Sequence, residues 1–303
     1  MKRAGARAIR QVAFEHRAKP TVGIEVFRLQ QLFDRMASGE LPVELELPER
    51  VSFHILFVGI SGSGQMTVDF RSVPIGARRL GFIAAGRVRQ FELDRTVDAW
   101  MVLIEPSVAV GLGTNVLSPA WEAPWLETSK AEHGELLAIV DQLVREQARP
   151  LDAYQPELLG SMCRTLLVRC ERLYGEAPTP HAAQLAQFFA LLERDFATSR
   201  SVEHYARGVG FSPRRLGELL VAHTDKSTKQ LIADRVMLEL KRALVFTEIT
   251  VKQLAVDTGF DEPTNLVKFF RLHTKLTPVE FRVQQRTFLP SARGSAPSSA
   301  KPR

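Results

Sequence analysis

Short apolar runs, in which β-branched and aromatic residues recur between turn-forming residues, fill the first third of the chain. Runs of this kind are typical of β-strands. Six of them span residues 24–29, 51–60, 65–70, 80–85, 88–93 and 99–105. Their spacing predicts a small barrel or sandwich. The Ser-Gly-Ser-Gly sequence at residues 61–64 is followed by neither Lys-Ser/Thr nor a helical pattern, so it indicates a hairpin turn rather than a phosphate-binding loop.

The apolar period becomes that of an α-helix from residue 131 onward. Residues 131–147 and 156–174 carry Leu, Ile and Val at helical spacing. One stripe of these side chains could pack on the β structure or against a second subunit, and the period alone allows either. The stripe consists of Leu136, Val140, Leu143 and Val144. After a Pro-containing stretch at residues 175–180, the pattern stays helical as far as residue 286.

These changes of pattern predict an α+β protein of two domains. The expected segments are a basic, flexible arm at 1–22, a β-barrel domain with two helices at 23–175, an all-α domain at 176–288 and a disordered tail at 289–303.

The all-α half contains an internal repeat. Ala206 and Gly210-Phe211 recur as Ala255 and Gly259-Phe260, at an offset of 49 residues. Each copy predicts a helix-turn-helix, because a small residue allows a close helix crossing and a Gly-Phe pair forms a left-handed, apolar corner. Four residues are the expected helix caps: Ser201 and Thr250 for the first helices, and Ser212 and Asp261 for the second.

A single helix over residues 228–246 is predicted between the two copies, about 28 Å long at 1.5 Å per residue. One turn of B-DNA advances about 34 Å, so such a helix suits two recognition helices that enter successive major grooves. A plain helical bundle is the alternative.

The repeat and the residues after it resemble the AraC/XylS family of transcriptional regulators over residues 185–286. The family's C-terminal signature is similar to Gly259-Phe260, Lys268-Phe269-Phe270-Arg271, Leu276-Thr277-Pro278 and Phe281-Arg282. Two positions depart from the family, which places Gly after the second recognition helix: Lys275 stands there, and Asp225 stands at the matching place in the first copy.

This resemblance implies that the exposed first turns of both recognition helices read bases. The residues that correspond are Arg214, Arg215, Gly217 and Glu218 in the first helix, and Pro263, Thr264, Asn265 and Lys268 in the second. Gly217 and Pro263 offer no useful side chain. Lys229, Arg271 and Arg282 are expected on phosphates.

The β-rich half resembles, more loosely, the cupin-like sensors of such regulators. Met66 and Arg89 occupy positions where cupin enzymes carry metal-binding His, and the seven His residues have no ligand spacing, so we expect no metal, no other cofactor and no catalytic residue. A small-molecule effector is expected instead, and arginines suit an organic acid. The candidate effector-binding residues are His54, Arg87, Arg89, Gln90 and Trp100.

Composition adds little to this picture. Lys and Arg number 40 against 34 for Asp and Glu, a net charge of +6, which favours a polyanionic partner. Cys163 and Cys170 are expected to be reduced and buried. Without an apolar run long enough to span a membrane, or a signal peptide, the protein is expected in the cytoplasm.

The sequence therefore predicts a double-stranded-DNA-binding regulator, an activator, that forms a homodimer and responds to a metabolite, with RNA polymerase as a further candidate partner. Two alternatives stay open: a cupin-type metalloenzyme with a helical appendage, and a DNA-binding protein whose first domain only dimerises.

Overall fold

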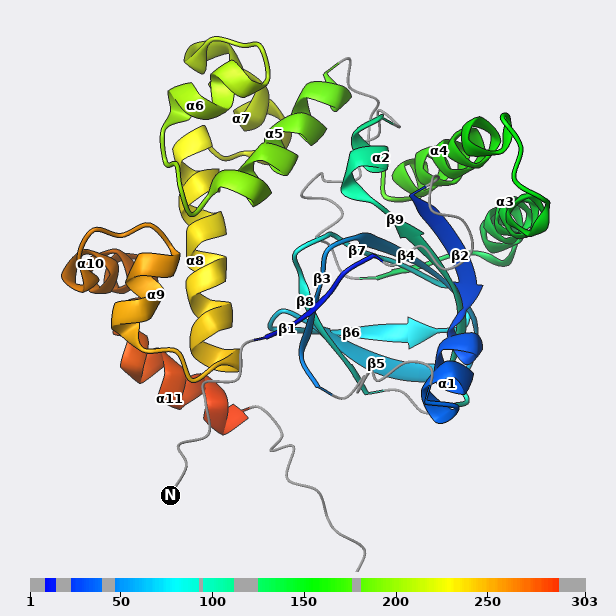
Figure 1. Ribbon diagram of the computed structural model, residues 1–303, viewed down its shortest axis with the longest axis horizontal. Coiled ribbons are helices and arrows are strands. Elements are labelled where there is room, and N and C mark those ends of the chain that lie inside the picture. Colours follow the sequence, from blue (N-terminus) through cyan, green and yellow to red (C-terminus); the bar gives the residue numbers. More distant parts are fainter. Residues whose placement is uncertain are drawn as a thin grey trace, which may run out of the picture. The chain divides into compact units, whose positions relative to one another are not determined.

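The structure is a computed structural model that describes residues 9–14, 23–39, 47–92, 95–111, 125–175 and 181–288 (Figure 1). The tail predicted at 289–303 lies outside these residues, as does most of the arm predicted at 1–22. By packing, the described residues form two compact units, one that ends at Val236 and one that begins at Met237.

In the first unit, ten strands of the described residues form two five-stranded sheets. Sheet A has the order β1 (Arg10–Val12), β3 (Glu49–Val51), β8 (Val88–Glu92), β5 (Ser63–Val68), β6 (Arg71–Gly76). Sheet B has the order β10 (Leu126–Glu127), β7 (Arg79–Ile83), β4 (His54–Ser61), β9 (Asp98–Ile104), β2 (Ile24–Arg28). Among the strand pairs of these sheets, β1 and β3 are parallel and the others are antiparallel.

Every strand predicted from the sequence is present, and the predicted α+β class is confirmed. The barrel is not closed, because the two sheets share no hydrogen-bonded strand pair among the described residues. The turn at Gly62, where φ is +73°, does not join two paired strands. There the chain passes from β4 in sheet B to β5 in sheet A, so the hairpin prediction for this turn is wrong.

Strand alternation separates two apolar cores. Ile55 and Phe57 of β4 face the space between the sheets, where they join Met66 of β5 and Phe91 of β8; we call this the inter-sheet core. Leu56 and Val58 of β4 belong to a second core on the opposite face of sheet B.

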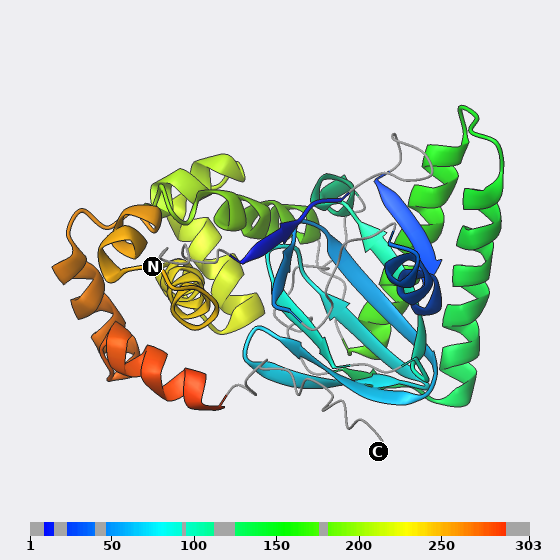
Figure 2. The same ribbon diagram turned by 60° about the horizontal axis from the view of Figure 1, so that its bottom comes forward.

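Two long helices cover that opposite face: α3 (Lys130–Ala148) and α4 (Gln155–Leu173) (Figure 2). Leu136, Val140 and Leu143 of the predicted stripe are buried in the same core as Leu56. The stripe therefore packs on the sheet, which decides between the two readings that the periodicity left open. Cys163 and Cys170 are free and buried, as predicted, and burial raises the pKa of the Cys163 thiol to about 12.

Two helices of this unit were not predicted: α1 (Leu29–Ala37) and α2 (Pro106–Gly111). Part of the predicted flexible arm is also ordered, since residues 10–12 form β1 on the edge of sheet A.

The remaining helices follow the repeat. They are α5 (Ala182–Asp195), α6 (Val202–Gly208), α7 (Pro213–Thr224), α8 (Thr228–Phe246), α9 (Val251–Asp257), α10 (Pro263–Thr274) and α11 (Pro278–Phe288). The predicted helix over residues 228–246 is continuous as α8. The division by packing falls inside α8, so it differs from the predicted domain boundary at residue 175. No helix of the described residues is long and apolar enough to cross a membrane.

Candidate DNA-binding interface and effector region

The first helix-turn-helix consists of α6 and α7, and its local signals act as predicted. Ser201 Oγ accepts a hydrogen bond from His204 N at 3.2 Å, and Ser212 Oγ accepts one from Arg215 N at 3.2 Å. Gly210, with φ of +75°, provides the left-handed corner between the helices. Leu216 and other apolar side chains of α7 face the core, so the opposite side of α7 is left to solvent.

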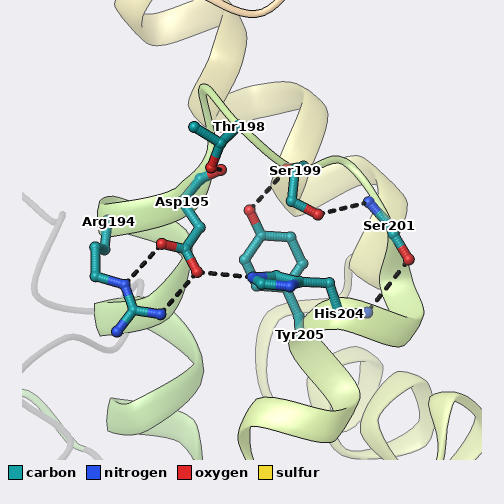
Figure 3. Close-up of polar contacts among 7 residues, drawn as sticks. All are labelled: Arg194, Asp195, Thr198, Ser199, Ser201, His204 and Tyr205. Atoms are coloured by element: carbon teal, nitrogen blue, oxygen red, sulfur yellow. Dashed lines mark hydrogen bonds and ion pairs between the residues drawn. The ribbon is translucent and has the colours of Figure 1, made fainter.

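A polar cluster that the sequence analysis missed fixes α6 onto α5 (Figure 3). The Asp195 carboxylate accepts hydrogen bonds from Arg194 Nε and Nη2 at 2.7 and 2.8 Å and lies 2.7 Å from His204 Nε2. Tyr205 Oη donates to the Ser199 carbonyl at 2.9 Å. The hydrogen bond from Arg194 lowers the pKa of Asp195 to about 2, and burial raises the pKa of Tyr205 to about 12. The partners all lie between residues 194 and 205, but the contact of His204 with Asp195 depends on how α6 packs on α5, so no local motif pointed to it.

The exposed face of α7 carries the predicted base-reading residues. Arg214 is 91% exposed along its side chain, and its Nε lies 3.0 Å from Glu218 Oε1. Arg215 Nη1 lies 3.8 Å from Glu218 Oε2, and Arg215 Nη2 lies 3.2 Å from His181 Nε2. Gly217 is partly buried beside them. The structure thus gathers the predicted residues of α7 on one surface, where a single carboxylate faces two guanidinium groups.

The second helix-turn-helix consists of α9 and α10. Thr250 Oγ1 accepts from Gln253 N at 3.1 Å, and Gly259 has φ of +71°, both as predicted. The prediction that Asp261 caps α10 is wrong, because the N-cap residue is Glu262, and its side chain makes no capping hydrogen bond. The turn here is one residue longer than in the first copy, which moves the cap by one position. Pro263 occupies the first helical position.

The exposed face of α10 carries four polar residues of the predicted set. Thr264, Asn265, Lys268 and Arg271 are all exposed, whereas Pro263 is partly buried. Leu266 and Phe270 of the same helix are fully buried. Helical spacing therefore places the predicted contact residues opposite the core.

The prediction of a phosphate contact by Arg282 is not supported by its surroundings. Arg282 Nε donates to the Leu244 carbonyl at 3.0 Å, and Nη2 donates to the Ile249 carbonyl. The guanidinium therefore caps the C-terminal end of α8 and stabilises the turn into α9. Thr277 caps the start of α11, since its Oγ1 accepts from Glu280 N at 3.3 Å and Glu280 Oε2 accepts from Thr277 N at 2.7 Å.

Comparison with protein families matches residues 205–284 to the family described as "Helix-turn-helix domain". The C-terminal region is an AraC-type helix-turn-helix domain. The match spans both copies of the repeat, so the AraC-type domain contains α7 and α10 together. No curated protein matches the chain in sequence.

Three of the solved structures that are similar to this chain are the following. ToxT from Vibrio cholerae is 13% identical over 86% of this chain and 97% of its own, with a TM-score of 0.38. A transcriptional regulator with an AraC-type DNA-binding domain from Chromobacterium violaceum is 22% identical over 37% and 95%, with a TM-score of 0.32. The DNA-binding domain of the global transcriptional factor AdpA, in complex with a target DNA, is 25% identical over 34% and 94%, with a TM-score of 0.32.

Among the predicted effector residues, His54 and Trp100 face away from the inter-sheet core. His54 lies on the same face of β4 as Leu56; its Nδ1 accepts from Ala85 N at 3.1 Å and its ring stacks on Phe82. Burial lowers the pKa of His54 to about 4, so the imidazole is neutral. Trp100 packs against the core under α3 and α4, with the Arg28 guanidinium 5.1 Å from its ring. Both residues serve packing on this face.

The other three candidates lie around β8. Arg87 Nη1 donates to Asp69 Oδ2 at 2.8 Å just before the strand begins. Gln90 is partly buried and lies on the face of β8 opposite to Arg89. Arg89 is buried and shares its face with Phe91 of the inter-sheet core. The five candidates therefore do not converge, and Arg89 is the one among them that faces the space between the sheets.

In the described parts of the chain, no three His, Cys, Asp or Glu side chains are grouped so that they could hold a metal ion.

Proposed function

We propose that the protein is a sequence-specific, DNA-binding transcriptional regulator that reads DNA with α7 and α10. The observation that carries the proposal is the repeated helix-turn-helix, whose two recognition helices each expose polar side chains in their first turns. Major-groove edges are read by side chains of this kind at the start of a recognition helix. The AraC-type family match supports the same role.

The two recognition helices suit different base edges. Arg214 of α7 can pair with guanine, and Glu218 can accept from cytosine N4 once Arg214 has left it. Asn265 of α10 can pair with adenine, and Lys268 can donate to guanine. Exposed Lys229 and Arg271 are proposed phosphate contacts, which position the protein without reading sequence. The 19-residue α8 between the copies, about 28 Å long, is compatible with major grooves about 34 Å apart.

Selection of bound duplexes from a random DNA pool tests this proposal, with the full chain at one fixed salt concentration. We expect enrichment of a motif with two blocks about one helical turn apart. A pool that stays random, with retention that depends only on salt, would contradict sequence-specific reading.

We also propose that the sheet-containing domain, residues 23–175, binds a small-molecule effector and that the protein acts as an activator in the cytoplasm. The buried guanidinium of Arg89 between the sheets supports a polar ligand. The alternative is a DNA-binding protein whose first domain only dimerises. An effector must change the affinity for the selected duplex, whereas the alternative predicts an unchanged dissociation constant with every ligand.

A homodimer is part of this proposal, because two copies of the protein can engage two half-sites. The apolar stripe of α3 is committed to the sheet, but α4 carries exposed apolar side chains on its outer surface. Tyr154 at its N-cap, Leu158 and Val168 are 72%, 43% and 43% exposed, and they follow the spacing of one helix face. We propose this face as the dimer contact. RNA polymerase is the proposed partner in activation.

A further inference from the structure

Arg89 is a buried charged side chain in an apolar place. Its exposed fraction is 5%, and alternation along β8 directs it to the same side as Phe91, a member of the inter-sheet core. The Arg89 guanidinium carbon lies 4.6 Å from the centre of the Phe91 ring. The guanidinium is therefore held against the apolar side chains between the sheets and away from water.

The hydrogen bonds of Arg89 are incomplete. Its Nη2 lies 3.6 Å from Glu49 Oε2, which is an ion pair at more than hydrogen-bonding distance. Its Nε and Nη1 have no hydrogen-bond partner in the part of the chain that the structure describes. Buried N–H groups of a charged side chain are nearly always satisfied in folded proteins, because desolvation without a partner is costly. Two open donors at a buried cation indicate a missing acceptor.

The local charge is also unbalanced. Glu49 is 1% exposed, and besides Arg89 it faces Arg10 of β1, whose Nε lies 3.7 Å from Glu49 Oε1. Among the described residues, the buried Arg89 and the half-exposed Arg10 share this one carboxylate. Burial lowers the pKa of Arg89 to about 10 although Glu49 acts to raise it. The existing carboxylate therefore compensates the buried cation only in part, and a second anion would complete the balance.

We propose that Arg89 is the anion subsite of the effector site, and that its ligand is a monocarboxylic acid with an apolar body. This inference rests on the proposed response to a small molecule. A carboxylate accepts charge-assisted hydrogen bonds from a guanidinium. The neighbouring Phe91, Phe57 and Met66 are fully or almost fully buried apolar side chains, which suit a hydrocarbon body and disfavour a more strongly hydrated dianion such as phosphate.

Matched ligand pairs test the proposal on the full-length protein. Straight-chain carboxylates from hexanoate to dodecanoate, together with benzoate, are each compared with their primary amides by isothermal titration calorimetry. Tryptophan fluorescence gives a second readout, because the ring of Trp125 lies in the inter-sheet core, 5.1 Å from that of Phe57. We expect at least one carboxylate to bind its site with an affinity about ten times that of its amide, or higher. If no carboxylate of the series binds more tightly than its own amide, the assignment of Arg89 as the anion subsite is overturned.

Two variants show whether the preference for carboxylate over amide depends on Arg89. Arg89→Met should abolish the difference between carboxylate and amide, whereas Arg79→Met, on the surface of the same domain, should retain it. Far-UV circular dichroism verifies that Arg89→Met is folded. If Arg89→Met is not folded, Glu49→Gln provides the test. It removes the carboxylate that competes for Arg89, so the affinity for the ligand carboxylate should rise several-fold. An unchanged or weaker affinity of Glu49→Gln would contradict the subsite.

The same samples separate this inference from the proposed function. Carboxylate binding that depends on Arg89 but leaves the affinity for the selected duplex unchanged would support the subsite and contradict the regulatory response. A ligand that changes DNA affinity without a preference for carboxylate over amide would support regulation and contradict the subsite.

Discussion

Two left-handed residues end the recognition helices, and they differ in chemistry. Asp225 follows α7 with φ of +56°, and Lys275 follows α10 with φ of +65°. Asp adopts this region more readily than most residues because its short side chain can bond locally. Lys275 adopts it at a steric cost, although its Nζ donates a hydrogen bond to the Leu272 carbonyl at 3.3 Å. The backbone at Lys275 is thus left-handed although no Gly stands there.

Replacement of Lys275 by Gly should therefore stabilise the protein by about 0.5–1 kcal/mol, because Gly adopts positive φ without steric cost. The matched variant Asp225→Gly should gain less. Urea unfolding of both variants measures the difference. A loss of stability in Lys275→Gly, or a larger gain in Asp225→Gly, would contradict this account of the two turns.

Asp195 makes the polar contact between α5 and α6 depend on pH. Its carboxylate has a pKa of about 2 in the folded protein, below the ordinary value of 3.8, mainly because Arg194 donates hydrogen bonds to it. A carboxylate with a lowered folded pKa stabilises the fold above its ordinary pKa, and this contribution is lost as the pH falls toward 2.

We expect Asp195→Asn to be less stable than wild type by about 1–2 kcal/mol near neutral pH, where hydrogen bonds to a charged group are lost. The difference in stability between wild type and Asp195→Asn should disappear between about pH 4 and pH 2. Urea unfolding across that range measures it. Asp234→Asn is the control, because its half-exposed carboxylate pairs only with Lys226 at the surface in the described contacts. A gap that stays constant down to pH 2 would rule out the ionised carboxylate as its cause.

At the scale of elements, local signals in the repeat were sufficient to place its helices. One of these signals, the cap of α10, was assigned to the wrong residue. Ser212 and Gly210 were predicted correctly because capping and left-handed corners depend on neighbouring residues alone. The cap of α10 was displaced to Glu262 by the longer turn. The helix α1 was missed because its N-cap is Arg28, paired with Gln31 rather than with a Ser/Thr signal, and directly follows a strand.

The two recognition helices should respond differently to loss of the predicted cap. Ser212→Ala should destabilise the protein by about 1 kcal/mol, since it removes the acceptor for Arg215 N. Asp261→Ala should change stability by less than about 0.5 kcal/mol, as expected for a surface substitution away from a cap. Thermal unfolding of the two single variants compares them directly. Equal losses would mean that Asp261 caps α10 after all.

Substitutions in the two long helices of the sheet domain should distinguish a core position from a surface position. Leu136→Glu places a charge in the core under α3 and should unfold the domain, whereas Leu158→Glu on α4 should leave it folded. If the α4 face is the dimer contact, Leu158→Glu becomes a monomer in analytical ultracentrifugation. A dimer that survives Leu158→Glu with unchanged affinity would exclude this face.

For the whole molecule, the sequence predicted the class and the repeat better than the effector region. Helical period and caps are local, so α8 was placed with the bounds that the structure gives it. The face on which a strand residue lies depends on register with strands far away in sequence. His54 and Trp100 consequently lie on the face under α3 and α4, while Arg89 lies between the sheets. The carbonyl partners of Arg282 could not be predicted for a similar reason, since they are more than thirty residues away.

The two recognition helices belong to different compact units, α7 to the unit that ends at Val236 and α10 to the unit that begins at Met237. If both read DNA, each should be responsible for its own part of the bound sequence.

The most direct test is selection of bound duplexes with two single variants, Arg214→Ala and Lys268→Ala, beside wild type at the same salt concentration. The account predicts a two-block motif for wild type, in which Arg214→Ala loses information in one block and Lys268→Ala in the other, at about 1–3 kcal/mol per lost base contact. Motifs that are identical in all three proteins would contradict reading by these helices.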